Sequence, residues 1–317
     1  MPMGPNYDEV VLTHVRFQAG VPLLNDVYFE ITRFDTDATN ILYLGDAVPS
    51  VGTIEFNKVN YITRVSQAIY ADTIPIWDRK SGKLTDFTTH FTFIIDTQGA
   101  SLYGHRLTFF LAPVGFQIRP NSAGGFLGLF NTTYTDSSRN QMIVIEFDSY
   151  VNVEWDPPFE HVGINKNSIS SARYTTWNAS LHSGDSVDVW VSYNSTSQIL
   201  NLSWSYGAGN DTGGNTSLSY QVDLREVLQE RVTVGFSAAT GANIERHILQ
   251  YWEFNSTLNI AEKSDNKSIG WKLAVGVNCP CWYFNSSSYS SIIYILDKTK
   301  KSSRDTSGDS RLDINER

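Results

Sequence analysis

The sequence lacks a cysteine framework. Only two cysteines occur in 317 residues, Cys279 and Cys281, and both lie near the C-terminus. The body of the chain before them therefore needs no disulfides. Their C-x-C spacing has no second pair or clustered histidine beside it, so it only weakly suggests a zinc site.

Excess positive charge is also missing. Lys and Arg total 24 against 33 Asp and Glu, which gives a formal net charge of −9 at pH 7. Such a chain has no general attraction to phosphate groups, so the composition argues against nucleic acid as a partner. The same balance argues against a polybasic membrane-surface anchor.

Long apolar runs are absent. No stretch of about 18 apolar residues is present to span a membrane, and residues 1–8 contain no apolar signal-peptide core. Either the gene model is incomplete at its start, or the chain is not exported.

Helical patterns are few, and short strand-like segments recur instead. Residues 87–93 and 186–193 alternate apolar and polar side chains, while 107–111 and 231–236 are rich in β-branched and aromatic residues. Gly, Asn and Ser turn signals separate such segments. The pattern predicts an all-β sandwich or jelly roll, with one helical turn near 224–228. We expect Trp190, Trp204 and Trp252 to lie in its core.

The composition changes near Ala261, where a polar segment is followed by a mixed one and then by a charged, Ser-rich tail. Nothing there is periodic enough for a second core. We predict an N-terminal extension over residues 1–24, one β domain over 25–258, and a linker with a mostly disordered tail over 259–317.

Nine N-x-[ST] sequons are present, and together they favour a secreted glycoprotein surface. Seven fall in the predicted domain, and the other two are Asn266 and Asn285. The seven predicted glycosylation sites are Asn131, Asn178, Asn194, Asn201, Asn210, Asn215 and Asn255.

Residues 146–161 carry the strongest chemical signal. Glu146 and Asp148 follow an apolar run at an i, i+2 spacing, so on a strand they project from the same face. Asn152, Asp156 and His161 come next, and a turn would bring them back over the two carboxylates. Carboxylates suit calcium, and imidazole with carboxylate suits a transition metal. A solvated acidic loop is the alternative, and the EF-hand template does not fit.

The order of these ligands resembles the metal loop of the legume-type (L-type) lectins, V-E-F-D-[ST]-[FY]-x-N-x-x-W-D-P followed by H-[IV]-G-I. Residues 145–164 match it, and 107–113, 122–130, 234–241 and 251–254 resemble further family segments in family order. The phrases at 156–158, 165–169 and 244–247 are most similar to ectodomains of plant L-type lectin receptor kinases. The resemblance implies a legume-lectin (concanavalin-like) jelly-roll sandwich over residues 25–258.

The resemblance also implies two metal ions that share carboxylates. Manganese would be held by Glu146, Asp148, Asp156 and His161, with Ser171 holding a bound water. Calcium would be held by Asp148, Asn152, Asp156 and the Tyr150 carbonyl. The metals would position a sugar-binding pocket lined by His105, Gly125, Tyr150, Asn152, Ala242 and Asn243.

One position departs from the family pattern. Sugar-binding members have Asp-Gly just before the "TFF" strand, where the carboxylate accepts two hydrogen bonds from a hexose. This chain has His105-Arg106. A neutral imidazole offers at most one acceptor, and Arg106 adds a long cation where the family usually has no side chain. We therefore expect weakened or altered ligand specificity, or a lectin-like protein that has lost sugar binding.

Glycoside hydrolases and kinases are the two enzyme classes that are alternatives to a binding protein. Jelly-roll glycoside hydrolases carry a third catalytic carboxylate after E-x-D, and Tyr150 and Val151 stand where it should be. A kinase is excluded by the absence of a Gly-rich nucleotide loop, V-A-I-K and H-R-D-x-x-x-x-N segments. Residues 270–277 resemble the approach to a transmembrane helix that then dissolves, so the chain resembles a truncated or alternatively spliced receptor kinase.

The sequence thus predicts a non-catalytic, carbohydrate-binding domain with Ca²⁺ and Mn²⁺. By resemblance it is extracellular or plasma-membrane associated, the ligand-recognition part of a receptor kinase in signalling or plant defence, and able to form a homodimer through back sheets.

Overall fold

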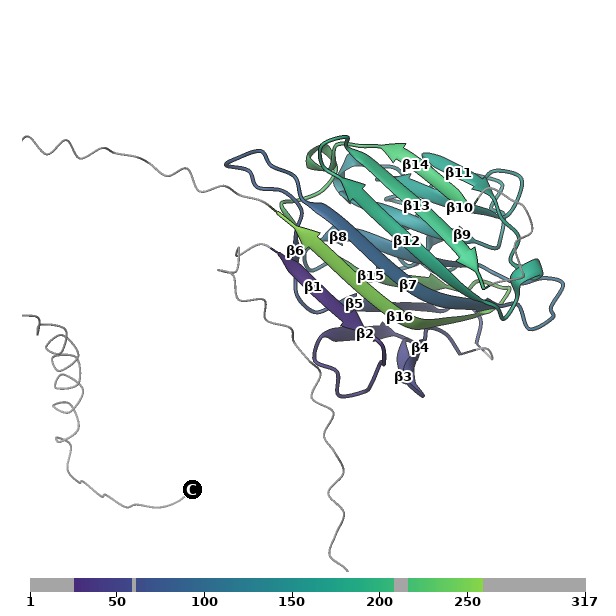
Figure 1. Cartoon of the computed structure of the whole chain (residues 1–317). Coiled ribbons are helices and arrows are strands. Elements are labelled where there is room, and N and C mark those ends of the chain that lie inside the picture. The colour runs from purple at the N-terminus through teal and green to yellow at the C-terminus, as the bar shows by residue number, and fades with distance from the viewer. Residues whose placement is uncertain (1–25, 59–60, 208–215, 259–317) are drawn as a thin grey trace, which may run out of the picture. The chain divides into compact units, whose positions relative to one another are not determined.

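A computed structural model describes residues 26–58, 61–207 and 216–258 (Figure 1). All of them belong to one compact unit, Met1–Glu262. The predicted extension over 1–24, the predicted tail over 259–317, both cysteines and the sequons at Asn210, Asn215, Asn266 and Asn285 lie outside the described residues.

Strands make up almost all of the regular structure. In chain order they are β1 Val27–Ile31, β2 Ile41–Gly45, β3 Val48–Ser50, β4 Thr53–Glu55, β5 Val65–Tyr70, β6 Ile74–Pro75, β7 Asp86–Asp96, β8 Arg106–Pro113, β9 Ile143–Asp148, β10 His161–Lys166, β11 Arg173–Thr176, β12 Ser186–Asn194, β13 Ile199–Tyr206, β14 Ser217–Gln221, β15 Arg231–Ala239 and β16 Arg246–Thr257. Short 3₁₀ turns are η1 Gly124–Phe126, η2 Ser138–Asn140, η3 Ser180–His182 and η4 Leu224–Glu226.

The strands form two antiparallel sheets that pack face to face. The back sheet has the order β14-β13-β12-β7-β16-β4-β3, with β1 also paired to β16, and the front sheet has the order β11-β10-β9-β8-β15-β5-β2, with β6 paired to β15. Sequence neighbours are often separated in space, as where β7 lies between β12 and β16 (Figure 1). The predicted all-β sandwich and the helical turn near residue 224 are confirmed.

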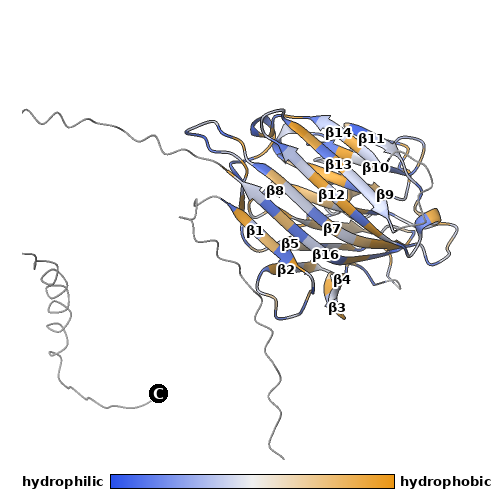
Figure 2. Ribbon diagram, in the orientation of Figure 1, coloured by the Kyte–Doolittle hydropathy of each residue, from blue (hydrophilic) through white to orange (hydrophobic). Residues whose placement is uncertain are grey.

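The back sheet has one buried and one exposed face. Along β12 the residues Val187, Val189, Val191 and Tyr193 are buried, while those between them are exposed or half-buried. The same alternation of hydrophobic and hydrophilic residues is visible along β7, β12 and β13 in Figure 2. This period of two is what a sheet with one solvated face requires.

The front sheet is covered on both faces, and this arrangement buries the candidate site. Every residue of β9 is buried. Ile143, Ile145 and Phe147 pack into the core between the sheets, whereas Val144 packs on the opposite face under loop residues such as Phe130. Because both faces are covered, β8 and β9 are continuous buried runs, and polar side chains on the outer face are shielded from water.

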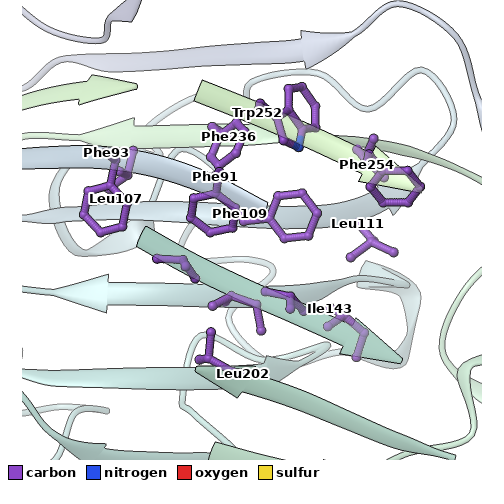
Figure 3. Packing of buried hydrophobic residues seen from close by; sticks show 14 of the residues in the cluster. Phe91, Phe93, Leu107, Phe109, Leu111, Ile143, Leu202, Phe236, Trp252 and Phe254 are labelled. Carbon is purple, nitrogen blue, oxygen red and sulfur yellow. The ribbon is translucent and has the colours of Figure 1, made fainter. Parts of the chain in front are cut away.

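Aromatic side chains fill the space between the sheets (Figure 3). Trp252 from the back sheet meets Phe236 from the front sheet edge-on, with ring centroids 4.9 Å apart. Trp204 and Trp252 are buried as predicted. The prediction for Trp190 is wrong: it is 43% exposed, because its neighbours Val189 and Val191 take the inward positions of β12, and it stacks on His90.

No helix among residues 26–58, 61–207 and 216–258 has the length and apolar character needed to cross a membrane.

Truncation of Phe236 to alanine should lower the free energy of unfolding by about 3–5 kcal/mol, because its ring is fully buried against Phe91, Phe109 and Trp252. Leu102→Ala, at a side chain that is 73% exposed, should change it by less than about 0.5 kcal/mol. Urea unfolding measures both; equal effects of the two substitutions would contradict the assignment of the core.

Candidate functional site

Three neighbouring strands of the front sheet carry the predicted metal ligands. The pairing registers place Arg106 on β8, Asp148 on β9 and His161 on β10 opposite one another in one row. The next row on the same face contains Thr108, Glu146 and Gly163. Side chains two residues apart share a face, so Glu146 and Asp148 project together, as the spacing predicts.

The loop after β9 folds back over these strands. The Asp148 carboxylate accepts a hydrogen bond from the Tyr150 amide at 2.9 Å, and Asp156 accepts one from the Asn152 amide at 2.7 Å. The Asp156 amide in turn donates to the Asn152 carbonyl at 2.9 Å. Trp155 braces the loop by packing against Phe126, with ring centroids 5.4 Å apart. Asn152 and Asp156 are thereby brought to the carboxylates of β9.

Glu146, Asp148 and His161 form a buried group whose ligand atoms all lie within 4.8 Å of one another. Glu146 Oε1 lies 3.2 Å from His161 Nε2 and accepts a hydrogen bond from Ser171 Oγ at 2.5 Å. Gly163 has a local reason to be glycine, since a Cβ there would collide with Ser171 Oγ. The set contains the carboxylate and imidazole donors that a transition metal accepts.

The Arg106 guanidinium lies inside the same site, and its side chain is 0% exposed. Nη2 is 2.7 Å from Asp148 Oδ2, pairs with Asp156 and donates to Asn152 Oδ1 at 3.1 Å. Nη1 lies 3.3 Å from Glu146 Oε2 and 3.4 Å from the Gly125 carbonyl oxygen. The sequence predicts Arg106 to be an added cation at the sugar pocket; the strand register instead places it against Asp148.

Burial dominates the electrostatics of this cluster. Burial raises the pKa values of Asp148 and Asp156, and the attraction of Arg106 only partly offsets that cost. Burial also opposes ionisation of Glu146, but Arg106, His161 and Ser171 outweigh it and lower its pKa to about 2. Burial acts to lower the pKa of Arg106, yet the three carboxylates raise it overall, so the guanidinium stays charged. One positive charge therefore faces three carboxyl groups.

The residues fit the two implied metals unequally. On the transition-metal side, Glu146, Asp148 and His161 converge. Arg106 contacts Glu146 through Oε2, whereas Oε1 lies 3.2 Å from His161 Nε2, and Asp156 Oδ1 is buried with no hydrogen-bond partner. On the calcium side, oxygens of Asp148, Asn152 and Asp156 already contact the Arg106 guanidinium. Calcium needs six to eight oxygen ligands with no cation among them, so this half of the site does not fit calcium.

The predicted pocket residues gather above the cluster. Tyr150 packs against His105, with ring centroids 4.3 Å apart. Gly125 lies directly against Asn152, because a Cβ at 125 would collide with the Asn152 amide group. The turn that contains the exposed Ala242 and the half-buried Asn243 is closed by a 3.3 Å hydrogen bond from the Gly241 amide to the Asn243 carbonyl.

His105 is held in place through its backbone and is shielded from water. Its carbonyl accepts hydrogen bonds from the Ser149 amide at 3.0 Å and the Ser149 hydroxyl at 2.7 Å. Only 6% of the residue is exposed. Burial, with the nearby charge of Arg106, lowers the pKa of His105 to about 4. The ring is therefore neutral near pH 7.

A buried polar network under the pocket was not predicted from the sequence. Glu245 Oε1 lies 2.6 Å from Ser149 Oγ and 2.9 Å from His247 Nε2. His247 Nδ1 is 3.0 Å from Asn57 Oδ1, and both His247 and Glu245 are fully buried. The i, i+2 spacing of Glu245 and His247 is a signal that both share one face; their partners are distant in sequence and carry no local signal.

Comparisons with known proteins identify relatives of this chain. The family model described as "Legume lectin domain" matches residues 26–270. L-type lectin-domain containing receptor kinase IX.1 of Arabidopsis thaliana is 39% identical over 302 residues, covering 93% of this chain and 46% of that protein. Lectin 6 of Medicago truncatula is 39% identical over 264 residues, covering 77% of this chain and 93% of the lectin.

Solved structures of lectins have the same fold. Lectin II from Ulex europaeus superposes with a TM-score of 0.68 at 36% identity, covering 74% of this chain and all of that one. The chain therefore belongs to the legume lectin family, and the predicted jelly-roll sandwich is confirmed. The family supports carbohydrate binding without enzymatic activity. The chain spans about half the length of the receptor kinases that it matches.

Acidification should destabilise the protein through His105. Its folded pKa of about 4 lies below the unfolded value of about 6.5, so the unfolded chain binds the proton first. The contribution of the neutral His105 ring to the free energy of unfolding is complete above pH 6.5 and is lost as the pH falls through 4. The loss between pH 8 and pH 5 is about 2 kcal/mol. Urea unfolding of wild type and His105→Gln isolates this part, and NMR titration of the imidazole locates the pKa. Titration near pH 6.5 in the folded protein would contradict the burial argument.

Proposed function

We propose that this domain binds glycan or a closely related ligand at the rim formed by His105, Gly125, Tyr150, Asn152, Ala242 and Asn243. The observation that carries the proposal is the state of Asn152. Its carboxamide oxygen accepts a hydrogen bond from Arg106, and its backbone amide donates one to Asp156. The amide NH₂ is then left to donate to a ligand hydroxyl, and Tyr150 lies two residues earlier in the same loop.

The rim suits a sugar because it combines one apolar face with several polar groups. The half-buried Tyr150 ring offers a surface for the apolar side of a pyranose, as aromatic side chains do when one end stays wet. The Gly125 amide and the 242–243 turn supply further polar contacts. Neutral His105 offers at most one acceptor, which is fewer than a carboxylate, so we propose a specificity different from that of simple mannose- or glucose-binding lectins.

One divalent transition ion, of which manganese is the family example, supports this rim in our proposal. Glu146, Asp148, Asp156 and His161 would hold it, with a water on Ser171. Its charge would balance the negative charge that Arg106 leaves uncompensated. What the ion supplies is order: it ties the loop that carries Asn152 to strands β9 and β10. The predicted calcium ion has no place in this proposal.

The receptor relatives suggest the biological setting. Because the matched receptor kinases are covered to 46% and 44% of their lengths, we propose that the domain is a ligand-recognition module of a plant cell-surface receptor in signalling or defence. Asn178, Asn194, Asn201 and Asn255 are exposed and Asn131 is half-buried, so we propose these five as glycosylation sites of an extracellular protein.

A glycan array at neutral pH tests the proposed binding. Wild type should bind a restricted set of glycans, with weak binding to mannose and glucose, and Asn152→Ala should lower affinity at least about tenfold because one ligand donor is lost. Glu226→Gln, an exposed change in η4, is the matched control. Metal analysis should find about one manganese per chain, absent from Glu146→Gln. Strong calcium-dependent binding to mannose or glucose would refute the altered specificity, and no glycan binding at all would refute the function.

The back sheet is the surface that we propose for homodimerisation, on the condition that it is not glycosylated. Its outer face carries the stacked pair Trp190 and His90. One row away, Asn255, Thr88, Ser192 and Asn201 lie opposite one another across four strands. Asn201 and Asn255 are sequon asparagines. Glycans attached to them would lie in the centre of any contact between two back sheets.

Enzymatic deglycosylation should therefore shift the protein from monomer to dimer, measured by analytical ultracentrifugation at tens of micromolar. Asn201→Gln with Asn255→Gln should produce the same shift, whereas Asn178→Gln should leave the glycosylated monomer unchanged. A fully glycosylated protein that dimerises as strongly as the double variant would contradict the proposal that glycans on the back sheet prevent dimerisation.

A further inference from the structure

Arg106 contacts the atoms that a calcium ion would need. Its Nη2 is bound to Asp148, Asp156 and Asn152 Oδ1, and Nη1 lies near Glu146 and the Gly125 carbonyl. We infer that the Arg106 guanidinium is a built-in cation that replaces calcium beneath the ligand-binding loop. In its statement about ligand binding, this inference rests on the proposed function; in its statement about calcium, it does not.

The position of Arg106 in the sheet accounts for this contact. Residue 106 is paired with Asp148 on one side and Ala239 on the other. Directly opposed residues of an antiparallel pair project from the same face with their Cβ atoms about 4.5–5.5 Å apart. A side chain at 106 therefore rises beside Asp148 toward the loop, and burial at 0% exposure shows that the loop closes over it.

A guanidinium can do the organising work of the ion. It is planar, permanently charged and carries five donors in a fixed fork, which suits carboxylates and amide oxygens. Here it joins Asp148 on the strand to Asp156 and Asn152 on the loop. It also holds the Asn152 oxygen, so that the amide NH₂ is directed away from the cluster. These are the links through which calcium would order the loop.

The two cations exclude each other. Calcium would have to take oxygens of Asp148, Asp156 and Asn152 that Arg106 already contacts, and the guanidinium has no exposed position within the site. One positive charge against three carboxylates still leaves room for one divalent ion, on the side of Glu146 and His161.

The consequence is a loop whose order does not depend on calcium. A covalently attached cation cannot be chelated or diluted, so its effective concentration is fixed by the fold. Wild-type protein should thus need only the transition ion. Removal of the Arg106 side chain should recreate an oxygen site that calcium can fill.

The test begins with the full chain stripped of metal by a chelator, dialysed and reloaded with manganese. Addition of 5 mM calcium, about fiftyfold above the roughly 0.1 mM dissociation constant of a tight extracellular calcium module, should move the wild-type melting temperature by less than about 1 °C. The same addition to Arg106→Gly should raise it by roughly 5–10 °C. Metal analysis after gel filtration should find no stoichiometric calcium in wild type and about one per chain in the variant.

Arg225→Gly is the control, because Arg225 is also paired with a carboxylate, Asp223, but belongs to η4 and contacts no residue of the site. It should bind no calcium. If Arg106→Gly folds only when calcium is present, the inference is supported. If Arg106→Gly folds neither with nor without calcium, the calcium titration of wild type alone tests the inference.

Two results of the calcium titration would overturn the inference: stoichiometric calcium in wild type with a thermal shift like that expected of the variant, or a folded Arg106→Gly that gains no calcium. A glycan array repeated with and without calcium tests whether ligand binding depends on calcium. Loss of all glycan signal would refute the proposed function while leaving the calcium result standing, and signal that requires calcium in wild type would refute the inference alone.

Discussion

The burial of three carboxylates on the outer face of the front sheet is the constraint on which the rest of the site depends. Glu146, Asp148 and Asp156 have side chains that are at most 1% exposed. Charges can be buried only when they are paired or bound to metal. Arg106 supplies one cation permanently, and this pairing connects strand β9 to the loop that carries Asn152. The positions of Tyr150, Gly125 and His105 follow from where that loop is held.

The architecture creates the low-dielectric setting that the cluster requires. The front sheet packs on the back sheet through one face and under loops through the other. The outer cover includes Phe130 and the Phe126–Trp155 contact, and Phe126 and Trp155 are the chain neighbours of Gly125 and Asp156. A second buried network, Ser149–Glu245–His247, fixes the floor under His105. On this legume lectin scaffold, we propose that the residue at position 106 decides which cation lies beneath the loop.

Much of this was predictable from the sequence. Alternation at 87–93 and 186–193 indicates strands with one solvated face, and the i, i+2 spacing of Glu146 and Asp148 fixes their common face. The orientation of Arg106 was not predictable, because it depends on the β8–β9 register, which no local pattern encodes. Trp190 was placed in the core from residue type alone, although the valines on either side of it already indicated the opposite face. Glu245 and His247 have partners 96 and 190 residues away.

The most direct measurement is a crystal structure of the chain grown with manganese and calcium together, with anomalous differences collected to identify each metal. We expect one metal peak, manganese, among Glu146, Asp148 and His161, and guanidinium density joining Asp148, Asp156 and Asn152. A calcium ion on those three residues, with Arg106 turned out of the site, would contradict it.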